Sequence, residues 1–151
     1  MDTAKTLHLL ETEEGFRPVP YTDSTGHSTI GIGYNLASRP RPSWWDGKAP
    51  WSYIQAMQQL QSDVLAICKE MDIRWPKWRT MADARQAICI SGIYQLGISG
   101  AAKFHDTIQA IEAGDFQAAA DHMAASLWAH QTPHRADRAE KMMLTGEWLP
   151  S

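Results

Sequence analysis

Two carboxylic acids and a hydroxyl lie close together in the stretch EGFRPVPYTDSTGHSTIGIGYN, which runs from position 14 to position 35. Glu14 is followed by Asp23 and then by Thr29, where a glycine-rich Thr-Ile-Gly-Ile-Gly run begins. Cleavage of a glycosidic bond needs a proton donor for the leaving oxygen and a second carboxylate that attacks the sugar or activates a water. The stretch therefore contains the residue types for sugar hydrolysis, provided that its two carboxyls have different environments.

The elements predicted around this stretch give the two carboxyls unlike surroundings. Glu14 continues the apolar face of a short predicted helix, which Gly15 ends as a C-terminal cap. A helix C-terminus disfavours a negative charge, which suits a proton donor. Asp23 opens a turn in which solvent keeps a carboxylate ionised, and the hydroxyl of Thr29, at the start of a predicted strand, is suited to holding a water.

The remainder of the chain predicts an α+β, mostly helical fold with one small sheet near the N-terminus. Residues 18 to 34 predict a small antiparallel sheet or hairpin, and the TIGIG run is typical of a strand. The predicted helices are a long one that a capping box starts at Ser52 to Gln55, one from about 82 to 96, two pieces separated by Gly114 and Asp115, and one from Thr132-Pro133 to Gly146.

Composition excludes several classes of function. The chain of 151 residues is 44% apolar and 21% charged, as in soluble globular proteins, and its net charge of −3 gives no general attraction to nucleic acid. The first ten residues lack the features of a signal peptide, and no apolar run reaches the length of a membrane span. We therefore expect synthesis in the cytoplasm and no stable membrane insertion.

The cysteines and histidines indicate neither redox nor metal chemistry. Cys68 and Cys89 lie in apolar helical contexts, which favours reduced core thiols. His130 and His134 have the spacing of a helical metal pair, but Pro133 lies between them and no carboxylate stands at ligand spacing. We expect no metal site.

Residues 38 to 51 contain three prolines and three tryptophans, too irregular for a regular element. Two interpretations are open for Trp44, Trp45 and Trp51. They could form a platform on which sugar rings stack, or an aromatic staple that closes the small lobe onto its own core. The other four tryptophans are expected in the core or at a lobe junction: Trp75, Trp78, Trp128 and Trp148.

The string EGFRPVPYTDSTGHSTIGIGY resembles the N-terminal catalytic segment of the phage-type lysozymes, glycoside hydrolase family 24. Two further blocks are similar to that family, RQAICISGIYQLG at 85–97 to its buried central helix and SLWAHQTPHRADR at 126–138 to its QTP-arginine segment. The resemblance implies a lysozyme-like fold, a single domain over 1–151 with a small lobe at about 15–55. A long helix at about 53–71 would join it to a helical lobe at about 72–151, which includes the N-terminal helix.

The resemblance also implies roles for individual residues. Glu14 matches the general acid, Asp23 the carboxylate that works with a nucleophilic water, and Thr29 the residue that helps to position that water. Arg135 matches an arginine that packs against the catalytic glutamate. Tyr34 departs from the family, which commonly has histidine there. The positions that match saccharide contacts are Asn35, Tyr94, Gln95, Thr107 and His122.

The activity that the resemblance implies is that of a muramidase. Such an enzyme hydrolyses the β-1,4 bond between N-acetylmuramic acid and N-acetylglucosamine in bacterial peptidoglycan, by inversion and without a cofactor. A short chain without a signal peptide favours a monomeric phage endolysin, made in the host cytoplasm and released through a holin to the wall in the periplasm.

Three alternatives remain at this stage. A catalytically weak lysozyme-like module could serve in cell-wall or protein binding, although the complete set of Glu14, Asp23 and Thr29 disfavours it. A lytic transglycosylase needs the acid but no carboxylate to activate a water. A lysozyme module of a phage tail is similar in sequence to an endolysin.

Overall fold

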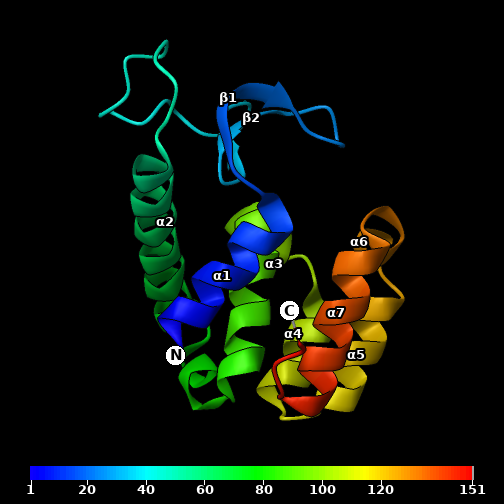
Figure 1. Cartoon of the computed structure of the whole chain (residues 1–151). Coiled ribbons are helices and arrows are strands. Elements are labelled where there is room, and N and C mark those ends of the chain that lie inside the picture. Colours follow the sequence, from blue (N-terminus) through cyan, green and yellow to red (C-terminus); the bar gives the residue numbers. More distant parts are fainter. Residues whose placement is uncertain (151) are drawn as a thin grey trace. The chain divides into compact units, whose positions relative to one another are not determined.

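The computed structural model describes residues 1–150 and confirms an α+β, mostly helical chain with a small antiparallel sheet. Within these residues it contains seven α-helices, one 3-10 helix and three strands (Figure 1). The chain divides into two compact units, one of Leu7–Asp63 and one of Met1–Thr6 with Val64–Ser151. None of the described helices is both long and apolar enough to cross a membrane.

Helix α1 (Thr3–Glu14) brings Glu14 to the first strand. The Asp2 carboxylate accepts a hydrogen bond from the Lys5 N–H at 3.0 Å, which satisfies one of the free donors at the start of the helix. At the other end Gly15 adopts φ +69° and donates its N–H to the Glu11 carbonyl at 2.8 Å. The predicted glycine cap is confirmed, and Glu14 is the last residue of the helix.

The sheet has the strand order β1 (Arg17–Thr22), β2 (Ser28–Gly31) and β3 (Tyr34–Asn35), with antiparallel pairing throughout. The predicted small sheet is confirmed, but the TIGIG run is not one strand. Gly31 and Gly33 have φ +66° and φ +68°, so the chain turns between two short strands. Glycine adopts this backbone without steric cost, and alternation with isoleucine alone did not reveal the turn.

The tryptophan-rich segment packs on the small unit itself. Trp45 and Trp51 are 7% and 2% exposed, and the centroids of their rings lie 5.8 Å apart in an edge-to-face arrangement. The Trp51 N–H also donates to the Pro18 carbonyl at 2.8 Å, which ties the segment to β1. For these two residues the aromatic staple is confirmed. Trp44 is 43% exposed and donates its ring N–H to Gln59 at 2.8 Å.

Helix α2 (Tyr53–Arg74) starts at the predicted capping box. The Ser52 N–H donates to the Gln55 side chain at 2.9 Å, and the Gln55 N–H donates to the Ser52 hydroxyl at 3.1 Å. Further along the helix, the buried Asp63 carboxylate accepts two hydrogen bonds from Arg39, at 2.8 and 2.7 Å. This pair fastens the loop after β3 to the helix.

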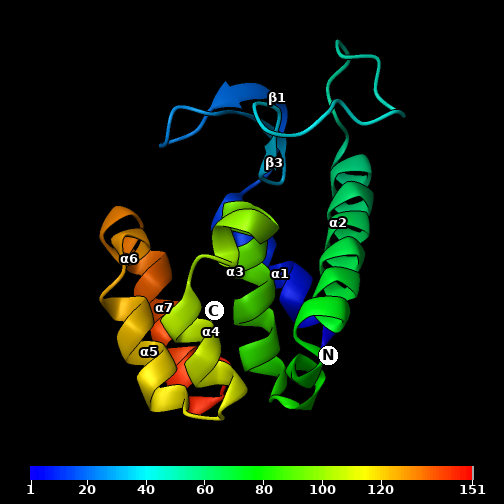
Figure 2. The same ribbon diagram turned by 180° about the vertical axis from the view of Figure 1, so that it is seen from behind.

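The other unit is helical in its described residues. After α2 it contains η1 (Pro76–Thr80), α3 (Asp83–Ala101), α4 (His105–Glu112), α5 (Phe116–Ala124), α6 (Leu127–Gln131) and α7 (Pro133–Thr145). Figures 1 and 2 show α4, α5 and α7 running beside one another. Helix α3 is interrupted at Gly97, whose φ is +74°.

The predictions for this helical unit are largely confirmed. Gly114 and Asp115 separate α4 from α5, and Gly146 ends α7 with φ +72°. Thr132 precedes Pro133 as the N-cap residue, but its hydroxyl donates backward to the Trp128 carbonyl at 3.0 Å and caps no helix N–H. The thiols are free, as predicted, and the expected tryptophans are buried or half-buried: Trp75, Trp78, Trp128 and Trp148.

The turn at Gly31 tests how tightly the staple is packed. A methyl group on Gly31 would lie 2.5 Å from the buried Trp51 ring, whereas one on Gly26, which also has positive φ, would meet nothing within 4 Å. We expect Gly26→Ala to cost about 1 kcal/mol of unfolding free energy through backbone strain, and Gly31→Ala about 1–3 kcal/mol more through the clash. Urea unfolding of both variants measures the difference, and equal losses would contradict the tight contact.

Candidate active site

The Glu14 side chain lies directly against the backbone of the β2–β3 turn. A Cβ atom on Gly33 would be 2.7 Å from Oε2 of Glu14 and 2.8 Å from its Cδ and Cγ atoms. Only a residue without a side chain leaves room for the carboxyl at this distance. Gly33 also has φ +68°, a conformation that other residues rarely adopt. The turn therefore holds Glu14 between the end of α1 and the sheet.

Tyr21 links Glu14 electrostatically to the other candidate residues. On β1 it is paired with Thr29 of β2. Burial raises the pKa of the Tyr21 phenol, and the charges of Glu14 and Asp23 raise it further, against the opposing effect of Arg17. Both candidate carboxyls thus act on the same phenol, and Thr29 is opposite it in the sheet. The structure brings together the three residues that the sequence singled out.

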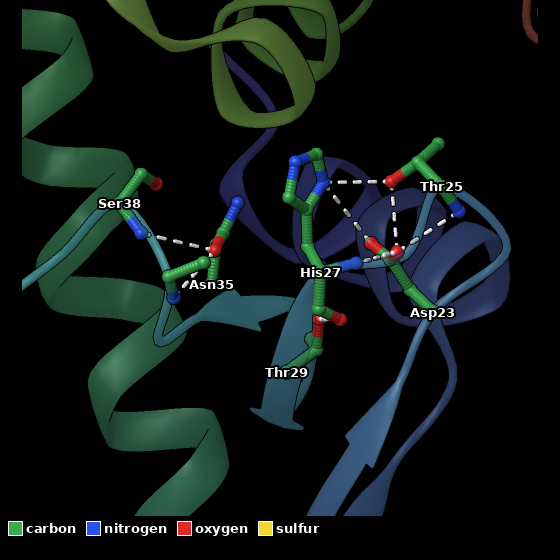
Figure 3. A network of polar contacts seen from close by, with 7 residues as sticks. Asp23, Thr25, His27, Thr29, Asn35 and Ser38 are labelled. Carbon is green, nitrogen blue, oxygen red and sulfur yellow. Dashed lines mark hydrogen bonds and ion pairs between the residues drawn. The ribbon is translucent and has the colours of Figure 1, made fainter.

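Asp23 lies in a turn that surrounds one of its two oxygens with donors. Its Oδ1 accepts hydrogen bonds from the Thr25 N–H at 2.9 Å, the Thr25 hydroxyl at 2.7 Å and the His27 N–H at 2.8 Å (Figure 3). Its Oδ2 lies 4.0 Å from Nδ1 of His27. The turn therefore fixes the orientation of the carboxylate through Oδ1 and leaves Oδ2 less constrained.

These contacts keep Asp23 ionised. Partial burial by itself raises the pKa of Asp23, but hydrogen bonds from the His27 N–H and from the Thr25 hydroxyl and N–H outweigh it. The pKa of Asp23 is therefore held below its ordinary value of 3.8. A carboxylate of this kind is suited to accept a proton from water or to stabilise positive charge, and unsuited to be the proton donor.

The hydrogen bonds also assign the protons of the neighbouring groups. An ionised carboxylate only accepts, so the single Thr25 hydroxyl proton points to Asp23. The Thr25 oxygen must then accept from Nδ1 of His27, 2.7 Å away, which places a proton on that nitrogen. Thr29 donates its own hydroxyl proton to the His27 carbonyl at 3.1 Å. The Thr29 oxygen can therefore act toward a water only as an acceptor.

Asn35, a predicted saccharide contact, lies on β3 opposite Thr29. Its side-chain oxygen accepts hydrogen bonds from the Ala37 N–H at 2.8 Å and the Ser38 N–H at 3.2 Å (Figure 3). The amide oxygen thus stabilises the loop after the sheet. The role of Asn35 as a saccharide contact stays a prediction.

The remaining predicted residues belong to the helical unit, and their roles stay predictions. Arg135 on α7 donates to the Ser91 hydroxyl at 3.1 Å, and Gln95 accepts the Trp128 ring N–H at 2.7 Å. Thr107 is buried, whereas Tyr94 is half-buried and His122 is exposed.

Sequence reasoning missed Thr25 and His27 as partners of Asp23, and Tyr21 as the phenol that both carboxyls influence. A signal for the first two was present, because an aspartate that starts a turn commonly accepts hydrogen bonds from the residues two and four positions further on. Tyr21 gave no such signal, since its importance depends on the pairing of β1 with β2.

The small antiparallel sheet and the mostly helical content fit an α+β fold of the lysozyme-like class. The family model for phage lysozyme matches residues 11–139, and the chain belongs to that family. The match includes Glu14, Asp23, Thr29 and Arg135.

Two relatives illustrate the similarity. The chain is 29% identical over 157 residues to the probable T4-type lysozyme 1 of Dictyostelium discoideum, covering 91% of this chain and 92% of that protein. It is 28% identical over 160 residues to the pre-baseplate central spike protein Gp5 of Enterobacteria phage T4. There the alignment covers 91% of this chain but only 27% of the spike protein.

The hydrogen bonds to Asp23 predict how the stability of the fold depends on pH. Because the pKa of Asp23 is lower in the folded chain than its ordinary 3.8, its ionised form stabilises the fold above that pH. This contribution is lost as the pH falls through the lower, folded value. Replacing Thr25 by Val removes a hydrogen bond to the charged form, so we expect the pKa of Asp23 to rise toward its ordinary value. The stability that Asp23 contributes at neutral pH, and therefore the stability lost on acidification, should become smaller.

Carboxyl-carbon NMR titration of Asp23, with acid unfolding followed by circular dichroism, measures both effects. Ser24→Ala is the matched control, because it removes a neighbouring hydroxyl for which the described residues show no hydrogen bond to Asp23. The same Asp23 titration in wild type and Thr25→Val would show that the turn does not set its ionisation.

Proposed function

We propose that this chain is a peptidoglycan hydrolase, a muramidase that cleaves the β-1,4 bond between N-acetylmuramic acid and N-acetylglucosamine. The observation that carries the proposal is the contrast between two carboxyls in one small unit. Glu14 lies at a helix end against Gly33, and Asp23 is kept ionised by three hydrogen bonds. Membership in the phage lysozyme family supports peptidoglycan as the substrate class.

In the proposed reaction Glu14 donates its proton to the glycosidic oxygen as the bond from the anomeric carbon to that oxygen breaks. A water attacks the same carbon, and its proton passes to the Asp23 carboxylate through Oδ2, the oxygen that the turn leaves less constrained. The Thr29 oxygen accepts the other hydrogen of that water, which fits its donation to the His27 carbonyl. A water on the face opposite the leaving group inverts the anomeric carbon, and the residues of this route require no cofactor.

A phage endolysin that reaches the wall through a holin is the biological role we propose. The second candidate is a tail-associated lysozyme, which the similarity to a segment of the phage T4 spike protein favours. The two roles predict different locations during infection. An endolysin accumulates in the infected cell and is absent from purified virions, whereas a tail lysozyme is a virion protein that mass spectrometry detects at stoichiometric amounts.

Glu14→Gln tests the chemistry, because it keeps the size of the side chain and removes its acidic proton. We expect the release of reducing ends from purified sacculi to fall at least about 100-fold, since general acid catalysis contributes roughly 10²–10⁴-fold. Glu13→Gln, the same change one residue earlier, is the control and should retain most activity. Binding to sacculi is measured in parallel by sedimentation and should survive in both variants.

The results separate the alternatives. Equal activity of wild type and Glu14→Gln would contradict the proposed acid. A wild-type chain that binds sacculi without releasing ends would support a wall-binding module, and anhydro-muramic ends in the product would indicate a lytic transglycosylase.

A further inference from the structure

Trp44 is the exposed member of the tryptophan-rich segment. All seven tryptophans of the chain lie in the part that the structure describes, and Trp44 alone among them is in an exposed position. Its ring centroid lies 4.7 Å from that of Trp51 at an interplanar angle of 57°. One side of the Trp44 ring therefore rests on the aromatic staple, while 43% of the residue's surface stays open to solvent.

The orientation of the Trp44 ring is fixed although the ring is exposed. Its ring N–H donates to Oε1 of Gln59 at 2.8 Å, and Nε2 of Gln59 donates to the buried Asp63 carboxylate at 2.9 Å. A side chain that turns freely in solvent loses that freedom when a ligand binds, and this loss weakens binding. Trp44 is already held, so a ligand that contacts its open side has less of this loss to overcome.

The contacts that hold Trp44 close into a circuit within the small unit. Arg39, which pairs with Asp63, lies over the Tyr34 ring at 4.0 Å, and the centroids of Tyr34 and Trp51 are 5.5 Å apart. The members of the circuit all belong to the unit Leu7–Asp63: Trp44, Gln59, Asp63, Arg39, Tyr34 and Trp51. Tyr34, where the family commonly has histidine, thus helps to support the exposed ring.

The loop around Trp44 is polar and cationic. Residues 40–50 contain two cations, Arg41 and Lys48, and one anion, Asp46, which give the loop a net charge of +1 in a chain of net charge −3. Arg41 and Lys48 are both exposed, and α2 has no acidic residue before Asp63. A single fixed ring in such surroundings differs from the continuous apolar patch of a protein interface.

We propose that Trp44 is a platform on which a sugar ring of the peptidoglycan glycan strand stacks. A pyranose has a face of C–H groups and a rim of hydroxyl and amide groups, so it complements an indole face that has polar neighbours. N-acetylmuramic acid also carries a carboxylate, for which Arg41 and Lys48 are suitable partners. The identity of the polymer rests on the proposed function, whereas stacking itself requires no hydrolysis.

The platform is separate from the candidate catalytic residues. Figures 1 and 2 show the tryptophan-rich segment beyond the first turn of α2, whereas the turn between β1 and β2, which contains Asp23, extends from the other side of the sheet. A glycan strand held at Trp44 is therefore held away from Asp23. We expect the platform to raise affinity for the polymer and to leave the chemical step unchanged.

NMR titration of the full-length Glu14→Gln chain tests the platform while cleavage of the sugar is suppressed. The indole N–H resonance of Trp44, assigned by its absence from the spectrum of the Trp44→Phe variant, reports the site directly. We expect it to shift with chitotetraose, an uncharged oligomer of N-acetylglucosamine. Peptide-free glycan strands should shift it at lower concentration, because they carry carboxylates. No shift at the highest soluble concentration of either ligand would overturn the proposal.

Sedimentation with purified sacculi then compares variants of the platform. We expect Trp44→Ala to weaken binding at least about fivefold, as for an aromatic anchor of a binding site. Trp44→Phe keeps a ring and should retain most of the affinity. Tyr53→Ala, which removes another exposed ring of the same unit, is the matched control and should bind as the wild type does. On chitotetraose the kcat of Trp44→Ala should equal that of the wild type.

Two results of the sedimentation would contradict the platform. One is undiminished binding by a Trp44→Ala chain that has the circular dichroism spectrum of the wild type, and the other is an equal loss of binding in Tyr53→Ala. A Trp44 resonance that shifts with glycan, in a chain whose wild type releases no reducing ends, would support the platform and contradict the hydrolase instead.

Discussion

The contact between the Glu14 carboxyl and the Gly33 backbone is the constraint around which the small unit is arranged. It requires a residue without a side chain at the turn. Gly33 meets this requirement and also adopts a positive φ. The turn is held from its other side, because the Trp51 ring occupies the place where a side chain of Gly31 would be. Trp51 is itself tied to β1 through the Pro18 carbonyl. The tryptophan-rich segment therefore supports the position of the candidate acid from a distance.

The second carboxyl, that of Asp23, is positioned by hydrogen bonds from residues nearby in the chain and not by packing. Asp23 is 31% exposed at its side chain, and its three donors come from Thr25 and His27, within four residues along the chain. Its ionisation is consequently a property of the turn sequence and can change without disturbing the aromatic staple. Glu14 depends on contacts that are distant in sequence. The two carboxyls of the proposed mechanism are thus positioned by independent means.

The features of the fold and of the site that could be predicted from the sequence are mainly those set by contacts between residues close together in the chain. The helix ends at Gly15 and at Ser52 were predictable because their caps lie within four residues. The candidate residues Glu14, Asp23 and Thr29 were identified from their spacing and the family resemblance, and the structure places them in one unit. The turn inside TIGIG was missed because strand periodicity does not report φ. The apolar pocket of the helical unit, lined by residues between Met71 and Met143, was missed too, since an apolar helix pattern predicts burial but not how completely neighbouring helices fill the space between them.

Gly31 and Gly33 of the small unit and Gly92 of the helical unit have opposite surroundings. In the small unit Gly31 and Gly33 are surrounded, and each makes room for a neighbouring side chain that the fold needs. In the helical unit Gly92 leaves its space unused by any neighbour. Close packing limits how far a side chain moves, so small changes of the backbone at Gly31 and Gly33 are resisted. On α3, by contrast, the position of Gly92 has room for an added methyl group.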